Sequence, residues 1–407
     1  MNKKIKYFLG FQHLLAMFGG TIIVPMVIGI DPSIALLTAG LGTLCFYYIS
    51  ERKVPVFLGS SSLYITIMSF ILHTEGLGAV KTGVIAAGIV YMIIAFIFRF
   101  LSEEKINEIF SPIVIGCLAI LIGLKMAPTA IQMCGYTMQN INLTDIFVST
   151  FVLIAFICFS FLKSFLSLIS IVLAIAVGYI LSMCLGLVDY SIITNAKWVG
   201  FSKDALHSIF TMPTFSLNAI VSMSLIAVIT FLEHVTDVRT NGKITGQNFI
   251  KDPGIHKTLF GDGFATFISG LLGGPVKCTY DENTSVLVLT KVYNPEVIKI
   301  ASIYAILLSL IGKIGAIIQT IPNSVMGGVS IILYGTSICL GIRIFIEDKI
   351  DFQEVRNIII VSITIIFGLC VDNIPLTKNI QLSGITIAMI LNIFLNLILP
   401  KKNNNTN

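Results

Sequence analysis

Hydrophobic residues run through the chain in long blocks separated by short polar breaks, a pattern typical of a membrane protein. The apolar segments lie at residues 11–30, 34–50, 54–72, 82–100, 111–127, 146–162, 165–187, 215–237, 259–273, 279–291, 297–320, 325–346, 356–372 and 380–399. A membrane-spanning helix needs about 20 apolar residues, so most of these segments can cross a bilayer, while the ninth and tenth are too short to do so as ordinary helices. We therefore expect an all-α polytopic membrane protein with about 14 transmembrane segments.

Composition supports a membrane protein and argues against a nucleic-acid-binding or metal-binding one. Of the 407 residues, 56% are hydrophobic and 12% are charged, about half the charged fraction of a soluble domain. We attribute the net charge of +5 to cytoplasmic loops rather than to a nucleic-acid surface. The eight cysteines lie scattered in apolar segments without a C-x-x-C pair, so we expect neither disulfides nor a metal site.

Charge also predicts the orientation of the chain. With an even number of spans and both termini inside, most of the 26 lysine and arginine residues fall on the inner side, as the positive-inside rule requires. Lys81 and Lys277 are among the few that fall near the outer side, and Lys313 lies in the middle of the eleventh segment. We expect a multi-pass protein of the cell (cytoplasmic) membrane with both termini cytoplasmic.

The polar stretch 189–213 divides the chain into seven segments and seven segments. An odd number per half predicts that the second half runs inverted relative to the first, a common transporter plan with its ligand site where the repeats meet. The third segment of each half carries polar residues, Gly59–Ser62 in one and Lys277–Asn283 in the other. We expect short extended stretches there, each leading into a half-helix whose free backbone groups face a flat polar ligand. The alternative is a re-entrant kink packed against its neighbours.

Four carboxylates interrupt apolar segments, at Glu233, Asp237, Asp281 and Glu282. A charge at mid-bilayer costs at least about 2.5–3.5 kcal/mol, so such residues indicate function. Glu233 and Asp237 are four residues apart and share a helix face, while Glu282 stands where a half-helix would begin, at its positive dipole end. We expect Glu233 to be the more readily protonated of Glu233 and Glu282.

Structural roles remain open for several of these residues. Asp237 could form an interfacial ion pair with Arg239 or Lys243, and Asp281 could cap the half-helix. His13 and His234 could be ligand-site residues or hydrogen-bonded packing residues. Lys313 could balance the acidic cluster or extend to the membrane edge.

Enzyme motifs are missing from the sequence. Residues 233–237 read E-H-V-T-D, which is not the H-E-x-x-H zinc pattern, and there is no P-loop, G-x-S-x-G or Rossmann fingerprint. We expect neither an enzyme nor a bound metal or cofactor. A channel is harder to exclude, although the sequence shows no repeated filter element.

Several motifs in order resemble those of the nucleobase–ascorbate transporter (nucleobase:cation symporter-2) family, and most of all its bacterial uracil permeases. They are Gln12-His13 with Leu14–Gly20 and Pro25, Leu58–Ser61, Glu233–Val235, Thr279–Asn283 with Thr290-Lys291, Ile321-Pro322, Val325–Ser330 and Gly341–Arg343. The likeness runs from about residue 8 to 395. It is specific because the motifs recur in the same order along nearly the whole chain.

The resemblance implies an architecture of fourteen spans in a seven-plus-seven inverted repeat. A core domain would comprise residues 1–110 (spans 1–4) and 214–322 (spans 8–11). A gate domain would comprise residues 111–213 (spans 5–7) and 323–400 (spans 12–14), followed by a polar tail at 401–407. The resemblance also implies proton-coupled uptake of a nucleobase, often by a homodimer.

The resemblance also implies site roles. Glu233 and Glu282 match the carboxylates that hold the base, Tyr280 would line the pocket, and the backbone at Ser62 and Asp281 would meet ring carbonyls. Proton coupling would fall to Glu233, Asp237 and Glu282. The supporting residues would be Gln12, His13, His234 and Asn283.

Three positions depart from the uracil permease pattern, and they bear on the substrate. Ser62 stands where an aromatic residue is usual, Asp281 where glycine is usual, and Asp237 where histidine is usual. An aspartate four residues after the glutamate is similar to xanthine and urate transporters, which however carry glutamine at the position of Glu282. We expect uracil:proton symport into the cell by alternating access. The alternatives are a xanthine or purine permease and, in another class, a channel or substrate-binding sensor.

Overall fold

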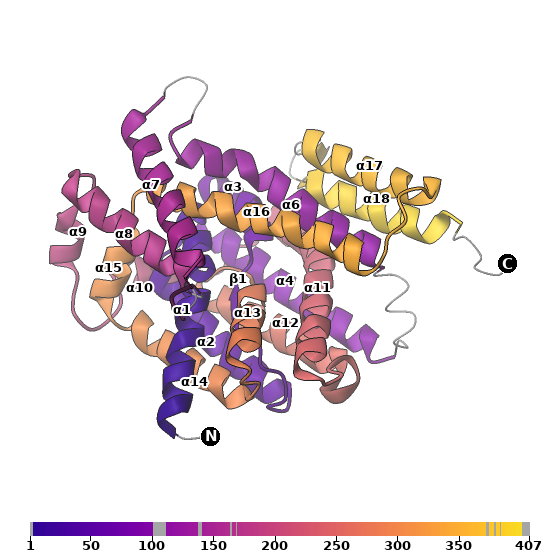
Figure 1. The fold of residues 1–407 in the computed structure, drawn as a ribbon, viewed down its shortest axis with the longest axis horizontal. Coiled ribbons are helices and arrows are strands. Elements are labelled where there is room, and N and C mark those ends of the chain that lie inside the picture. The colour runs from indigo at the N-terminus through magenta and orange to yellow at the C-terminus, as the bar shows by residue number, and fades with distance from the viewer. Residues whose placement is uncertain are drawn as a thin grey trace. The chain divides into compact units, whose positions relative to one another are not determined.

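The structure is a computed structural model that describes residues 3–100, 111–136, 141–162, 165–167, 169–371, 374–377, 380–382 and 384–400. Helices dominate, and a helix overlaps each of the fourteen predicted segments (Figure 1). In the first half they are α1 (Lys3–Ile28), α2 (Pro32–Ile49), α3 (Ile65–Glu75), α4 (Leu77–Phe98), α6 (Pro112–Met133), α7 (Leu143–Ser160), α8 (Ser170–Cys184), α9 (Tyr190–Asn195) and α10 (Lys203–Phe210). In the second half they are α11 (Leu217–Thr245), α12 (Ile255–Leu272), α13 (Asp281–Thr290), α14 (Pro295–Ser309), α15 (Gly312–Gln319), α16 (Asn323–Glu347), α17 (Val355–Cys370) and α18 (Gly384–Ile398).

Two pairs of short strands interrupt the helices. Strand β1 (Leu58–Ser60) pairs antiparallel with β2 (Lys277–Thr279), and β3 (Ile374–Thr377) pairs antiparallel with β4 (Ile380–Leu382). Short 3-10 turns lie at Ser62–Tyr64 and Phe165–Ser167, and a π-helical turn lies at Ile250–Gly254. The extended stretches predicted in segments 3 and 10 are therefore confirmed. The polar tail 401–407 lies outside the described residues.

Length and hydropathy identify the membrane-crossing helices among the described residues. Six helices are long and apolar enough to span a bilayer, or seven if α14 and α15, which meet at a bend of 83°, are one span. The chain is thus a multi-pass helical membrane protein, since about 20 apolar residues suffice for one crossing. The full count of fourteen spans and the inverted repeat stay predictions.

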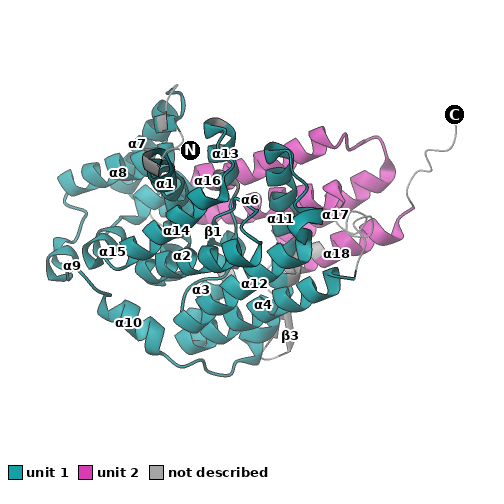
Figure 2. Cartoon of the chain, turned by 90° about the horizontal axis from the view of Figure 1, so that it is seen from below, with its two compact units in different colours: residues 1–100, 130–330 teal, residues 101–129, 331–407 magenta. Residues whose placement is uncertain are grey.

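The chain forms two compact units, coloured separately in Figure 2. The first comprises residues 1–100 and 130–330, and the second comprises residues 101–129 and 331–407. The division into core and gate domains stays a prediction.

Close helix packing builds the first unit. Helix α12 packs against α2 and α4, and α14 packs against α1 and α2. At the α4–α12 crossing, a Cβ on Gly88 would lie 2.6 Å from the backbone nitrogen of Phe267. Small residues permit such close contact where lipid provides little hydrophobic drive between helices. The helices that carry the candidate site are therefore held against one another by backbone proximity.

Two lysines of the first unit, the buried Lys81 and the half-buried Lys313, bond to the segment between the two halves. The Lys81 ammonium donates to the carbonyl oxygens of Ser208, Ile209 and Thr211 at 3.0, 3.1 and 2.7 Å, at the C-terminal end of α10. The Lys313 ammonium donates to the Ile193 carbonyl and, at 3.1 Å, to that of Thr194 in α9. Both lysines satisfy helix-end carbonyls, which favour cations. Lys313 therefore serves the connecting segment rather than balancing the acidic cluster.

Candidate functional site: paired strands leading into two short helices

The centre of the first unit is the pairing of β1 with β2. In the register, Leu58 lies opposite Thr279, Gly59 opposite Cys278, and Ser60 opposite Lys277. Each strand runs into a short helix, β1 through a 3-10 turn into α3 and β2 directly into α13. With 11 and 10 residues, neither helix spans a bilayer. The arrangement leaves backbone N–H groups at two helix starts beside the strands.

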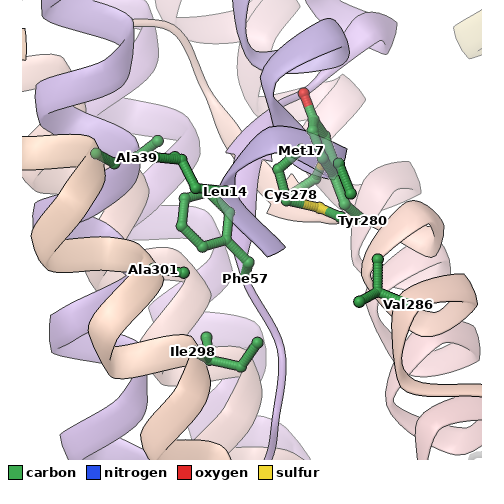
Figure 3. Close-up of a cluster of buried hydrophobic side chains, with 11 residues drawn as sticks. Leu14, Met17, Ala39, Phe57, Cys278, Tyr280, Val286, Ile298 and Ala301 are labelled. Atoms are coloured by element: carbon green, nitrogen blue, oxygen red, sulfur yellow. The ribbon is translucent and has the colours of Figure 1, made fainter. Parts of the chain in front are cut away.

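Tyr280 packs against the paired strands β1 and β2. Its hydroxyl donates to the Ser60 carbonyl oxygen at 2.7 Å, and its ring covers Gly59, where an added Cβ would lie 2.2 Å from ring carbons. Leu14, Met17 and Tyr280 belong to one buried apolar cluster (Figure 3). The ring is held from α1, β1 and β2 together, so this predicted pocket residue has a fixed position.

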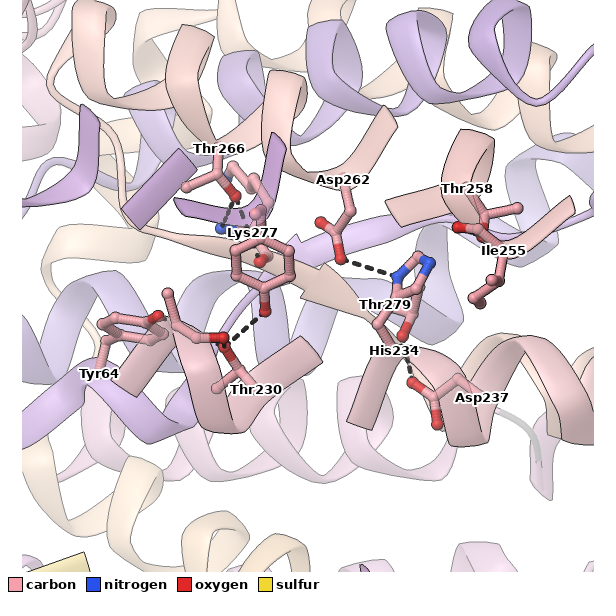
Figure 4. A network of polar contacts seen from close by, with 12 residues as sticks. Tyr64, Thr230, His234, Asp237, Ile255, Thr258, Asp262, Thr266, Lys277 and Thr279 are labelled. Carbon is pink, nitrogen blue, oxygen red and sulfur yellow. Dashed lines mark hydrogen bonds and ion pairs between the residues drawn. The ribbon is translucent and has the colours of Figure 1, made fainter. Parts of the chain in front are cut away.

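Asp237 of α11 is tied to β2. The Thr279 hydroxyl donates to the Asp237 carboxylate, and both residues are buried (Figure 4). The Asn241 amide donates at 2.9 Å to the backbone carbonyl of Asp237, one turn before it. Asp237 therefore contacts β2, the strand that leads into α13.

A second buried pair joins α11 to α12. His234 Nδ1 lies 2.9 Å from an Asp262 carboxylate oxygen, and their side chains are 1% and 0% exposed. Glu233 precedes His234 in α11 and is partly buried. Together α11 and α12 bring three carboxylates, Glu233, Asp237 and Asp262, close enough to Cys278 of β2 to interact with it electrostatically.

Sequence reasoning missed Asp262, although a signal was present. It stands between two glycines in the short ninth segment, and the energetic argument applied to the other intramembrane carboxylates applies equally to it. The burial of Lys277 was not predicted either: the residue is fully buried, and its ammonium donates to the Ala35 carbonyl at 3.2 Å. Its side chain thus reaches α2 inside the unit.

His13 and Asn283 connect α1 to α13. His13 Nδ1 lies 3.0 Å from the Asn283 side-chain oxygen, and the Asn283 amide donates to the Pro55 carbonyl at 2.6 Å. The two residues are buried, as is Gln12 next to them. The predicted supporting residues therefore fix the start of α13 against α1 and the segment leading to β1.

The remaining predicted residues lie at the two helix starts. Ser62 is half-buried and begins the 3-10 turn that leads into α3. Asp281 begins α13, with Glu282 next along the backbone; the side chains of both lie outside the described ones. Their roles as ligand and coupling residues stay predictions.

A tyrosine–threonine cluster supports α11 beneath these contacts. The Tyr91 hydroxyl donates to the Thr230 hydroxyl, and the Tyr64 hydroxyl lies 3.4 Å from the same oxygen. All three residues are fully buried, so the α11 turn that precedes Glu233 is tied to α4 and to the turn before α3. Among the described residues, no group of three or more His, Cys, Asp or Glu side chains could hold a metal ion.

These features define a class: a multi-pass helical membrane protein in which two paired strands each lead into a short helix. A solved structure of the mouse anion transporter Slc26a9 in its inward-facing state has this fold, with a TM-score of 0.71 at 11% identity over 97% of this chain and 68% of that one. The chain belongs to the permease family "Xan_ur_permease", whose model matches residues 4–377, and this is the nucleobase–ascorbate transporter family that its motifs resemble. It is therefore a transporter and not an enzyme.

Curated relatives match over almost the whole chain. The uracil permease of Bacillus subtilis (strain 168) is 38% identical over 397 residues, covering 96% of this chain and 91% of the relative. The uracil permease of Escherichia coli (strain K12) is 36% identical over 394 residues, covering 96% and 90%.

Proposed function

We propose that this permease is a uracil:proton symporter that imports uracil by alternating access. The observation that carries the proposal is the antiparallel pairing of β1 with β2. Each strand leads into a short helix, α3 or α13, that contacts α11, the helix with Glu233 and Asp237. Uracil offers N–H donors and carbonyl acceptors in one plane. A site with carboxylates on one side and free backbone amides on the other matches that pattern. Relatives that carry the name uracil permease support this substrate.

In the proposed complex, Glu233 and Glu282 accept hydrogen bonds from the ring N–H groups. Backbone amides at Ser62 and Asp281 donate to the ring carbonyls, and Tyr280 lines the pocket. The fixed position of the Tyr280 ring over Gly59 supports this role, because a rigid wall limits the orientations of a planar ligand. Ser62 supplies no aromatic face, so recognition rests on hydrogen bonds.

Proton coupling in this proposal involves Glu233, Asp237 and Glu282. A proton bound at these carboxylates favours one conformation over the other, and its release reverses the preference. Gln12, His13, His234 and Asn283 support the site, and Asp262 orients His234 through the 2.9 Å contact. The coupling is thus built on helices that also hold the substrate.

The proposed architecture has fourteen spans in a seven-plus-seven inverted repeat. A core of residues 1–110 and 214–322 rocks against a gate of residues 111–213 and 323–400. We place the protein in the cell membrane as a homodimer with both termini cytoplasmic. No cofactor, metal or nucleic acid takes part.

Uptake of labelled uracil by purified protein in liposomes tests the proposal. An inward proton gradient should drive accumulation, and collapsing the gradient with an ionophore should abolish it. Glu233→Gln and Glu282→Gln should each replace a charge-assisted hydrogen bond by a weaker neutral one, lowering apparent affinity about tenfold. Gradient-insensitive uptake that survives both substitutions together would contradict the mechanism.

The second candidate is a xanthine or purine permease of the same architecture, favoured by Asp237 at the position four residues after Glu233. Competition of labelled uracil uptake by unlabelled uracil, thymine, xanthine and guanine separates the two. A channel or substrate-binding sensor is excluded if uracil accumulates above its external concentration. Xanthine competing better than uracil would replace the primary proposal.

A further inference from the structure

A cationic cluster surrounds one exposed tyrosine at the end of α2. The Arg52 guanidinium carbon lies 5.3 Å from the centroid of the Tyr48 ring, and the Lys299 ammonium lies 5.8 Å from the same centroid. The Tyr48 side chain is 50% exposed. It stands one residue before the end of a helix that is long and apolar enough to span the bilayer. Tyrosines at such helix ends occupy the headgroup region.

The backbone holds Arg52 in this place. Glu51 and Arg52 have φ values of 58° and 61°, a left-handed conformation that is uncommon for residues other than glycine. The Arg52 amide donates to the Tyr47 carbonyl at 2.8 Å, which closes the end of the helix. Strained backbone of this kind persists where its surroundings fix it, and it often marks a functional position.

The carboxylates nearby are already occupied by other lysines. Glu51 bonds to Lys53 and Lys257, and Asp252 bonds to Lys53. Glu296 bonds to Lys6 and interacts more weakly, through space, with Lys299. Among the described residues, Arg52 and Lys299 form no ion pair with a carboxylate. In the described part of the chain, three acidic groups thus pair with three lysines, and Arg52 and Lys299 both lie over the Tyr48 ring without such a partner.

We propose that Arg52, Lys299 and Tyr48 form a binding site for the headgroup of an anionic phospholipid. A phosphodiester would accept hydrogen bonds from the guanidinium and the ammonium, while the tyrosine ring packs against the glycerol and upper acyl region. Charge complementarity favours this occupant, because the site offers two positive charges at headgroup level that form no ion pair with a described carboxylate. A zwitterionic lipid would bring a choline or ethanolamine cation against them.

Native mass spectrometry of the full chain in mixed micelles of phosphatidylcholine and phosphatidylglycerol tests this site. Wild type should retain phosphatidylglycerol in preference to phosphatidylcholine. Each lysine or arginine near an anionic surface strengthens binding about fivefold. Arg52→Gln with Lys299→Gln should therefore weaken the preference for phosphatidylglycerol over phosphatidylcholine about 25-fold. Arg52→Lys with Lys299→Arg should retain most of it.

The matched control is Lys197→Gln with Lys203→Gln, which removes two positive charges from the exposed connecting segment. This variant should retain phosphatidylglycerol as wild type does. Equal retention by the Arg52/Lys299 double variant, or equal loss by the control, would overturn the site. Displacement of the lipid by millimolar inorganic phosphate would show a simple anion site and overturn it as well. Unfolding in phosphatidylcholine alone, measured for every variant, separates lost binding from lost folding.

Discussion

The Thr279 hydroxyl donates a hydrogen bond to the carboxylate of Asp237, although the two residues are 42 positions apart. Thr279 belongs to the strand that leads into α13, and Asp237 belongs to α11. One hydrogen bond therefore links the strand pair β1–β2 to the helix that carries Glu233. Any change in the charge of Asp237 acts directly on the strand that leads into α13.

Thr279→Val tests this link because valine keeps the shape of threonine and removes the donor. Leaving a buried carboxylate short of a hydrogen bond costs about 1.5–3 kcal/mol, so we expect uracil uptake to fall at least about tenfold. Thr279→Ser keeps the hydroxyl and should retain uptake. Wild-type uptake by the valine variant, measured in liposomes, would show that the bond has no role in transport.

Gly59→Ala should damage the site through packing alone. The new Cβ would lie 2.2 Å from the Tyr280 ring, and overpacking of this kind costs about 1–3 kcal/mol. We expect a lower temperature of thermal unfolding in detergent and loss of uptake. Gly335→Ala in α16 is the control, because an added Cβ there meets no atom within 4 Å. A stable, active Gly59→Ala protein would mean that the Tyr280 ring moves freely.

Asp262→Asn should reduce uptake without unfolding the protein. The change removes the charged partner of His234, a hydrogen bond worth about 1.5–3 kcal/mol, or a 10- to 150-fold effect. Asp262→Glu should also reduce uptake, because the side chain is fully buried and an extra methylene in a packed interior costs about 1–3 kcal/mol. Asp204→Asn, an exposed aspartate in α10, is the matched control and should transport normally.

The ion pairs of Glu51 should make stability depend on pH. Hydrogen bonds from Lys257 and Lys53 lower the pKa of Glu51 from 4.5 to about 2. Because the pKa is depressed in the folded protein, the stabilisation is complete above about pH 4.5 and is lost as the pH falls toward 2. The difference in unfolding temperature between wild type and Glu51→Gln should be constant from pH 7 to pH 5 and shrink below pH 4.5. A difference that grows on acidification would contradict this assignment.

Much of this fold follows from hydropathy, but the contacts between its elements do not. The polar residues at 59–62 and 277–283 predicted extended backbone in two segments, because charged and small polar residues interrupt an apolar run. Hydropathy holds no information on which strand meets which, so the register of Gly59 opposite Cys278 could not be predicted. Lys277 illustrates the same limit: the charge count placed it near the outer side of the membrane, whereas it is fully buried in the strand pair.

The candidate site was predictable at those residues whose charge costs free energy inside the membrane. Glu233 and Asp237 were identified because a carboxylate in an apolar segment needs a reason to be there. Asp262 satisfies the same test and was overlooked, and its pairing with His234 could be found only from the three-dimensional contact. The side chains of Asp281 and Glu282 lie outside the described ones, so their roles still rest on sequence.

The pairing of Ser60 with Tyr280 has a consequence for how the protein is made. These residues are 220 positions apart, so β1 is synthesised and inserted long before β2 exists. Until then, the backbone of Leu58–Ser60 lacks its strand partner, and bare lipid cannot satisfy those groups. During translation, the backbone N–H and C=O groups of β1 must therefore be hydrogen-bonded by water or by the insertion machinery, or be shielded from lipid by the helices of the first half. A ribosome stalled before residue 277 would hold a chain that has inserted but has no binding site.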